Sequence, residues 1–400
     1  MRDGVERGAL AGNVADALEY LRRLAARLAR TPQALRHAVA VCEAGEINTI
    51  VLMLGPQPVE PGSAREIDDQ WLGRALGTPV EIVAIAAVGV GVGLLANVTR
   101  VVLRDGRRLL VKLPSTDPRA RSIAQQFGYY AREAGAYRSL LDRSGLATAR
   151  CHAVVDTEHG PALILDELVD HSSADQLVGA TIGQALAAAD LLGDLHARFW
   201  NDPVLAVCAW LPGPTDAVIT MYDHLFALTW ESFCAMTVDL LPEAHLRTAE
   251  GVIGRFAEVC AEFARAPRTL VHGDFRLDNL LFAPAGHAAA IDWQLAAWGR
   301  GAYDLAFFAS GSIDDGVLAQ FEPALIARYH ARLVTNGVQG YSLAACRHDY
   351  LGGLVMNLPN PVTALVAVPP GNERGARLLR ENARRALATV ARHATSLSSW

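Results

Sequence analysis

Three oxygen-bearing side chains lie close together in one β-rich, loop-rich stretch of the sequence, residues 268–293. Asp274 and Asn279 lie five residues apart in a loop after an apolar strand, and Asp292 directly follows a second apolar run. Phosphoryl transfer requires a cation that neutralises phosphate oxygens and a group that orients the attacking hydroxyl and accepts its proton. Mg²⁺ prefers oxygen ligands, usually one or two side chains beside phosphates and waters. The spacing therefore predicts Asn279 and Asp292 as Mg²⁺ ligands and leaves Asp274 for the hydroxyl.

A fourth candidate is Lys112, the single lysine among 36 basic residues. An arginine-rich composition beside abundant Ala and Gly is typical of a GC-rich genome. Such a genome encodes Arg at positions where either Arg or Lys would be accepted. A lysine that is retained in such a sequence indicates a position that requires the compact charge of an ammonium group and does not accept the planar guanidinium group. The alternative is a surface lysine that survived by chance. Lys112 lies inside a β-rich run, and this setting favours the first interpretation.

Before Leu168 the sequence predicts an antiparallel sheet with one inserted helix, which carries Glu133. Asp105-Gly106 between two β-rich runs is a strong hairpin signal, and His159-Gly160 marks a second turn. In chain order we expect a helix at 66–80, strand-like sequence from 81, strands at 98–103 and 108–113, a helix at 119–142, and strands at 151–156 and 162–168.

Beyond Leu168 the pattern becomes mostly helical, apart from the island at 268–293. A β-rich part followed by a helical part indicates an α+β fold, because a doubly wound sheet would show alternating βαβ units. The expected helices span 181–199, 219–238, 244–265, 303–310, 315–334 and 372–394. We predict three regions: a helical N-terminal extension and linker at 1–60, a β lobe at 61–167 and a helical lobe at 168–400.

In these motifs the chain resembles the aminoglycoside-phosphotransferase-like branch of the protein-kinase fold. HGDFRLDN matches the catalytic loop of that family, HGDxxxxN, and IDW matches its metal-binding segment. The continuation GRGAYDLAFF resembles the family's trailing helix, in which Asp304 would brace the catalytic loop. The motif IDWQ…GAYDLA is similar to the corresponding motif of bacterial relatives of ecdysteroid-kinase-like enzymes. The resemblance covers residues 66–395 and implies a bilobal kinase-like fold, ATP and Mg²⁺ as cofactors, and a small-molecule alcohol as acceptor.

The resemblance also implies roles for residues outside the island. Lys112 would hold the α- and β-phosphates, and Glu133 would pair with it. Backbone groups of Glu167 and Leu168 would contact adenine. The glycine-rich stretch with Gly91, Gly93 and Asn97 would cover the nucleotide.

Each of these assignments has an alternative. A GxGxG stretch also occurs in dinucleotide folds, but those place a helix directly after the glycines, whereas a β-branched run follows here. Glu133 by itself would usually be a solvated helix residue. His272 and His196 are expected to structure the fold. Arg276 need only be exposed, and contact with phosphate or an anionic substrate is the alternative. Gln294 has no assigned role.

The acceptor is less well specified than the nucleotide. Residues 168–267 carry thirteen acidic residues against four arginines, and an acidic wall would suit a cationic acceptor. Aromatic residues of the same stretch would suit a sterol, macrolide, acyl chain or sugar face, although core packing and solvated faces account for most of both sets. The wording of the motifs favours a hydrophobic or amphipathic alcohol. The aromatic candidates are Phe199, Trp200, Trp210, Tyr222, Phe226, Trp230 and Phe233.

Two other functions are compatible with a kinase-like fold. A nucleotide-binding pseudokinase or scaffold would be expected to lose one of Lys112, Asp274, Asn279 or Asp292, and all four are present. A protein kinase would carry an activation loop after Asp292, and no such segment is evident.

Composition narrows the cellular setting. The net charge of -6 gives no reason to expect nucleic acid or an anionic membrane as partner. Basic amphipathic sequence at 10–42 is expected to form a solvated helical hairpin; contact with a membrane is the alternative. Six scattered cysteines argue against a zinc site or a disulfide framework. We expect a cytoplasmic protein without membrane insertion; no signal fixes the number of subunits.

Overall fold

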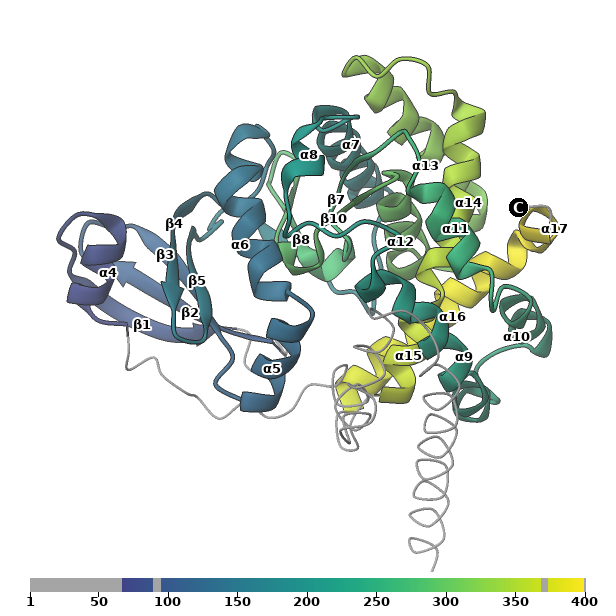
Figure 1. Ribbon diagram of the computed structural model, residues 1–400, viewed down its shortest axis with the longest axis horizontal. Helices are drawn as coiled ribbons and strands as arrows, with labels where there is room; N and C mark the ends of the chain where they lie inside the picture. The colour runs from purple at the N-terminus through teal and green to yellow at the C-terminus, as the bar shows by residue number, and fades with distance from the viewer. Residues whose placement is uncertain (1–66, 89–94, 368–372, 399–400) are drawn as a thin grey trace, which may run out of the picture.

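A computed structural model describes residues 67–88, 95–367 and 373–398. They form a small lobe built on a sheet and a larger helical lobe, with α6 between the sheet and the helices (Figure 1). This is the predicted α+β, bilobal arrangement. The predicted extension at 1–60 and the glycine-rich stretch with Gly91 and Gly93 lie outside the described residues. None of the described helices combines the length and apolarity that crossing a bilayer requires.

The small lobe is a five-stranded antiparallel sheet in the order β1-β2-β3-β5-β4. Side chains of β3 alternate between its two faces, as strand geometry requires. Leu109 and Val111 pack with Leu72 of α4 in a small core, whereas Leu110 and Lys112 face the other way. The elements are α4 (Asp69–Leu76), β1 (Ile82–Val88), β2 (Ala96–Leu103), β3 (Arg108–Pro114), β4 (Cys151–Thr157) and β5 (Gly160–Asp166).

The prediction of one continuous helix over 119–142 is wrong. The segment forms two helices, α5 (Pro118–Gln126) and α6 (Tyr129–Ser139), separated at Gly128. Gly128 has φ +69°, a left-handed conformation that glycine adopts without a Cβ penalty and that cannot continue a right-handed helix. The break lets α6 run beside the sheet and carry Glu133 towards Lys112.

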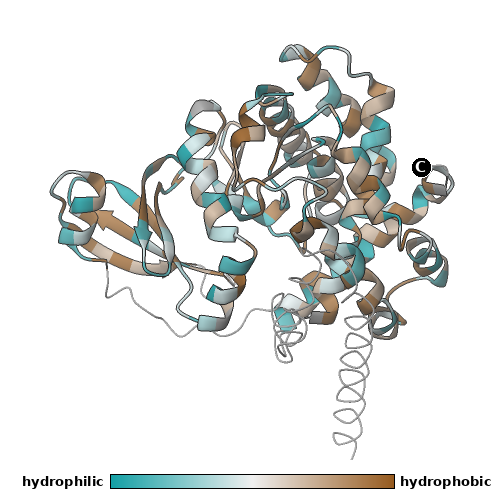
Figure 2. Cartoon of the chain, in the orientation of Figure 1, coloured by the Kyte–Doolittle hydropathy of each residue, from teal (hydrophilic) through white to brown (hydrophobic). Residues whose placement is uncertain are grey.

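The large lobe begins with the short strand β6 (Ser172–Ser173). Apolar residues from most of its helices form one buried core, and Figure 2 colours the apolar stretches of these helices brown. Its first helices are α7 (Ile182–Arg198), α8 (Val204–Val207), α9 (Ala217–Thr237), α10 (Glu243–Glu250) and α11 (Phe256–Phe263). After the site elements come α12 (Ala302–Ser312), α13 (Asp315–Thr335), α14 (Leu343–Asn357), α15 (Pro359–Ala367), α16 (Glu373–Arg392) and α17 (Ala394–Ser398).

Two further differences from the predicted helices have local causes. The helix expected over 244–265 is divided into α10 and α11, because Gly254 adopts φ +85° between them. Helices α14 and α15 fall in a stretch for which the sequence pattern predicts no element. Both bury residues on most of their faces, so they show no polar–apolar periodicity.

Candidate active site

The predicted catalytic loop lies between two short strands, β7 (Thr269–Val271) and β8 (Leu280–Phe282). Its last residues form a single 3-10 turn, Leu277–Asn279. Within this turn Asn279 donates from Nδ2 to the Asp274 carboxylate Oδ2 at 2.9 Å and to the Asp274 carbonyl at 2.9 Å. These bonds fix the Asp274 carboxylate relative to the Asn279 amide.

Asp304 at the start of α12 braces this loop from below, as expected from the resemblance. Its side chain is fully buried. One carboxylate oxygen accepts the His272 backbone N–H at 2.7 Å, and the other accepts that of Gly273 at 3.0 Å. His196 lies 3.3 Å from the same carboxylate, buried against Tyr329. His196 and His272 are therefore packed, structural residues.

Gly273 permits a close approach that no other residue would. It has φ +82°, and a Cβ on it would overlap the carbonyl oxygen of Leu295. Leu295 ends the 3-10 turn Trp293–Leu295 that follows Asp292. The glycine thus brings the catalytic loop against the segment that carries Asp292.

Lys112 joins the two lobes. Its Nζ lies 2.7 Å from Oε2 of Glu133 on α6 and 2.8 Å from Oδ1 of Asp292, which follows β9 (Ala288–Ala290). The expected pairing of Lys112 with Glu133 is present. Asp292 has φ +66°, rare for a residue with a side chain, and such strain is commonly held at functional sites.

The charges at the site shift one another's protonation. Burial would lower the pKa of Lys112, but Asp292 and Glu133 hold it above its usual value. Burial would raise the pKa of Asp292, but Lys112 holds it below its usual range. At Asp274 burial prevails over the nearby Arg276 guanidinium, so its pKa is raised. A carboxylate with a raised pKa is a stronger proton acceptor.

The oxygen atoms at this position fit a hard divalent cation. Both Asn279 amide protons are directed at Asp274, and among the described residues no donor contacts the Asn279 Oδ1 atom. Asp292, which lines the cavity together with Asp274, offers a second, anionic pair of oxygens. Amide and carboxylate oxygens are the ligands that Mg²⁺ accepts.

The predicted adenine segment follows β5. The Glu167 side chain is turned towards Arg108 and Arg100, at 2.7 and 2.6 Å, and its backbone N–H donates to the Arg108 carbonyl. Leu168 accepts a bond from the His171 N–H. Asn97 lies on β2 and donates to Thr116 at 3.3 Å. The assignment of these residues to nucleotide binding stays a prediction.

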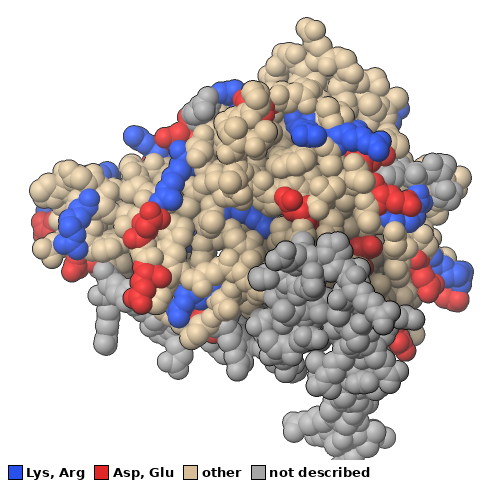
Figure 3. All heavy atoms as spheres, viewed as in Figure 1, with Lys and Arg blue, Asp and Glu red and all other residues tan. Residues whose placement is uncertain are grey.

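A cavity of about 470 Å³ opens from Lys112, Asp274 and Asp292 into the large lobe. None of the thirteen acidic residues of 168–267 lines it, so the alternative of an acidic wall finds no support in this cavity. Several of these acids instead form surface pairs with arginines, such as Asp190 with Arg328 at 2.6 Å. Figure 3 shows acidic and basic groups interspersed over one face of the molecule.

Of the seven aromatic candidates, Tyr222 lines the cavity, whereas Phe199, Phe226 and Phe233 are buried in the core. Sequence reasoning missed most of the apolar lining. The missed residues come from α11, α12, α14 and α16 as well as β10 (Ala297–Gly299), and short-range patterns carry no sign of their convergence. Among them are Phe256, Phe263, Trp298, Tyr303, Phe307, Met356 and Leu379.

Comparison with solved structures finds one that supports the fold with a TM-score above 0.5. A crystal structure described as that of a candidate aminoglycoside phosphotransferase from Ralstonia eutropha jmp134 aligns with a TM-score of 0.55 at 14% identity, covering 82% of this chain and 97% of that one. A macrolide 2'-phosphotransferase from Brachybacterium faecium aligns with a TM-score of 0.48 at 16% identity, covering 78% and 98%. Comparison with the curated proteins finds no match. Residues 87–342 match the profile of the Phosphotransferase enzyme family, and the chain belongs to this family.

Proposed function

We propose that this protein transfers the γ-phosphoryl group of ATP, with Mg²⁺, to a hydroxyl group of a small molecule. The observation that carries the proposal is the position of Lys112, which contacts both Glu133 and Asp292. That contact joins the β lobe to the segment that carries Asp292. Lys112, Asp274 and Asp292 line one cavity, and Asn279 donates to Asp274, which supports roles for the four in phosphate, Mg²⁺ and hydroxyl binding.

The roles follow from these contacts. Lys112 would hold the α- and β-phosphates, and Glu133 keeps its ammonium in place. Asn279 and Asp292 would hold Mg²⁺, which when bound neutralises charge on the phosphate oxygens. The Asp274 carboxylate would orient the acceptor hydroxyl and take its proton. Gly91, Gly93, Asn97 and the backbone of Glu167 and Leu168 are proposed to contact the nucleotide.

The proposed reaction is a direct in-line displacement. The acceptor oxygen forms a bond to the γ-phosphorus while the bond from that phosphorus to the β–γ bridging oxygen breaks. The hydroxyl proton passes to Asp274, and ADP leaves. No phosphoenzyme is formed.

The rival function is a nucleotide-binding scaffold without transfer. A test is ATP and GTP turnover, with and without Mg²⁺, over a panel of alcohols, with mass spectrometry for products about 80 Da heavier, the mass of one added phosphoryl group. Asp274→Ala should reduce turnover by about 100-fold or more. Asp278→Ala, in the same loop, is the matched control and should lose at most about tenfold.

Equal turnover by wild type and Asp274→Ala would contradict the mechanism. Nucleotide binding with no product from any alcohol would favour the scaffold.

A further inference from the structure

The described walls of the cavity carry four basic side chains: Lys112, Arg132, Arg276 and Arg300. Three of them have a carboxylate within ion-pair distance. The pairs are Lys112–Asp292 at 2.8 Å, Arg276–Asp274 at 3.3 Å and Arg300–Asp349 at 2.5 Å. Arg132 has none among the residues that the structure describes.

Arg132 lies on α6 and is 4% exposed. Its guanidinium donates from one terminal nitrogen to the Phe127 carbonyl at 2.8 Å, which satisfies one of five N–H groups and supplies no negative charge. Asp216 acts on it only from a greater distance. Burial lowers the pKa of Arg132, and this effect outweighs Tyr129, whose ring centroid lies 5.5 Å from the guanidinium carbon, together with Tyr222 and Asp216. A buried, uncompensated charge is strongly unfavourable unless a ligand neutralises it.

The surroundings of Arg132 place it on the acceptor side of the site. Its sequence neighbour Glu133 turns to Lys112 and the phosphate-binding side. The groups that act on Arg132 are instead Tyr129 and, from α9, Tyr222. The field of Asp274 in turn reaches both tyrosines. Arg132, both tyrosines and Asp274, the residue proposed to take the hydroxyl proton, line the same cavity.

The rest of the cavity is mostly apolar, with a few uncharged polar side chains such as Gln294, Asn360 and Asn382. Aromatic and aliphatic side chains from α9, α11, α12, α14 and α16 line it, and the only carboxylates on its described walls are Asp274, Asp278 and Asp292, each paired with a basic residue. A cationic acceptor would meet no free negative charge here. An apolar body with one anionic group would satisfy both the walls and Arg132.

We propose that the acceptor is a hydroxylated carboxylic acid with an apolar body, whose carboxylate binds Arg132 while its hydroxyl lies at Asp274. A guanidinium matches a planar carboxylate through two parallel N–H···O bonds. This assignment rests on the proposed phosphotransfer only for the fate of the hydroxyl. Recognition of the carboxylate can be measured without turnover.

The first experiment is binding of octanoate and decanoate, and of octanamide and decanamide, to the full chain by calorimetry at pH 7.5. Each amide has the shape of its acid but no charge. Wild type should bind the acid about 10- to 100-fold more tightly, the range for a hydrogen bond between charged groups. Arg132→Gln should bring the two within about threefold, and Arg132→Lys should retain part of the preference.

The control is Arg328→Gln, which removes an exposed arginine paired with Asp190 and should leave the preference unchanged. Melting temperatures of all variants establish that they are folded. Equal binding of acid and amide by wild type would overturn the proposal. So would an unchanged preference in folded Arg132→Gln, or no binding of any of the four compounds.

The second experiment separates this inference from phosphotransfer. With 10-hydroxydecanoate and 10-hydroxydecanamide as acceptors, Arg132→Gln should raise KM for the acid about 10- to 100-fold and leave KM for the amide unchanged. Acid-selective binding without any phosphorylated product would uphold the carboxylate site and overturn the proposed function. Phosphorylation of both compounds with equal KM would uphold the proposed function and overturn the carboxylate site.

Discussion

At Lys112 one ammonium nitrogen serves two carboxylates, Glu133 and Asp292. The side chain is 14% exposed, so the nitrogen is confined between the lobes. A guanidinium would present a wider, planar set of nitrogens at this point and could not keep both contacts in the same place.

Lys112→Arg should therefore lower kcat by about 100-fold or more, although the charge is conserved, because preorganised contacts of this kind contribute that much to transition-state stabilisation. Steady-state ATP turnover measures the loss. The control is Arg328→Lys, which replaces arginine by lysine at an exposed position. It should change kcat less than twofold. A near-wild-type rate for Lys112→Arg would refute this interpretation of the single lysine.

The sequence predicted Lys112, Glu133, Asp274, Asn279 and Asp292 as one site, and the structure brings them together. Their prediction was possible because a fixed spacing on a loop, or a position on a strand, determines where such residues lie. Arg132 carries no such signal: it is one more arginine in an arginine-rich chain. Arg132 differs from the other basic residues of the cavity because no carboxylate among the described residues lies within ion-pair distance of it. Which side chains surround it depends on residues remote in the sequence.

Among the elements, α13, α14 and the end of α16 converge on one buried carboxylate, that of Glu322. Tyr350 donates to one of its oxygens at 2.6 Å, and His393 contacts the other at 2.8 Å. Burial would raise the pKa of Glu322, but these partners and Arg392 hold it below its usual value. A lowered pKa means that the ionised group stabilises the fold, fully above about pH 4.3, the unfolded value.

Glu322→Gln should lower the free energy of unfolding by about 1–3 kcal/mol at pH 6.5. The difference from wild type should shrink as the pH falls below about 4.3 towards the lowered folded-state pKa, since wild type then loses the ionised form. Chemical denaturation at pH 6.5 and pH 3.5 measures it. Glu243→Gln, in an exposed pair with Arg247, should have little effect at either pH. A difference that stays constant on acidification would contradict the assignment.

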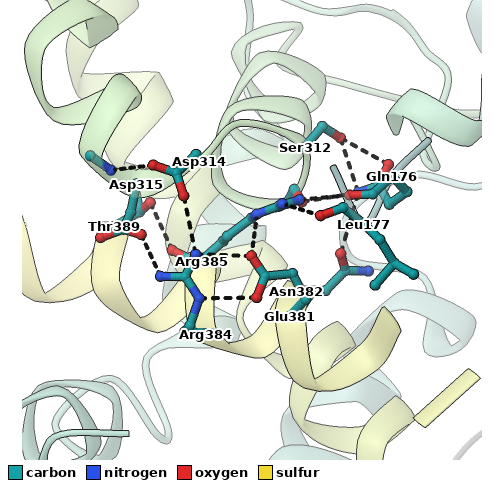
Figure 4. A network of polar contacts seen from close by, with 12 residues as sticks. Gln176, Leu177, Ser312, Asp314, Asp315, Glu381, Asn382, Arg384, Arg385 and Thr389 are labelled. Atoms are coloured by element: carbon teal, nitrogen blue, oxygen red, sulfur yellow. Dashed lines mark hydrogen bonds and ion pairs between the residues drawn. The ribbon is translucent and has the colours of Figure 1, made fainter. Parts of the chain in front are cut away.

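At the scale of the whole molecule, α16 closes the cavity with residues from the end of the chain. Adjacent arginines on this helix have different surroundings (Figure 4). Arg385 is 2% exposed and donates to the carbonyls of Gln176 and Leu177 at 2.7 and 2.9 Å. Arg384 is more exposed and contacts Asp315 and Glu381 at 2.5 and 2.9 Å.

Arg385→Met should lower the free energy of unfolding by about 2–5 kcal/mol, because buried carbonyls lose their donors. It should also raise KM for the acceptor more than KM for ATP, since Gln176 and Asn382 line the cavity beside this network. The matched variant Arg384→Met should lose about 1 kcal/mol or less. Equal losses for the two variants, in stability and in KM, would show that the network does not shape the cavity.

The bilobal fold could be predicted from the sequence because hairpin signals and helical periodicity are local. The walls of the cavity could not, because they join parts of the chain as distant as Leu95 and Ala386. The sequence could not decide between an acidic and an apolar wall for the same reason: residue counts give the charge of a segment but not the direction in which its side chains point.

Arg132 and Glu133 are adjacent on α6: Glu133 contacts Lys112, which is proposed to bind phosphate, and Arg132 is proposed to bind the acceptor carboxylate. Because one helix carries both residues, a shift of α6 that changes one contact would also change the other. Thermodynamic linkage then requires reciprocity: ADP should change the dissociation constant of decanoate by the same factor by which decanoate changes that of ADP. Calorimetric titration of each ligand in the presence of the other measures both factors. In Arg132→Gln both factors should equal one, meaning that neither ligand changes the dissociation constant of the other.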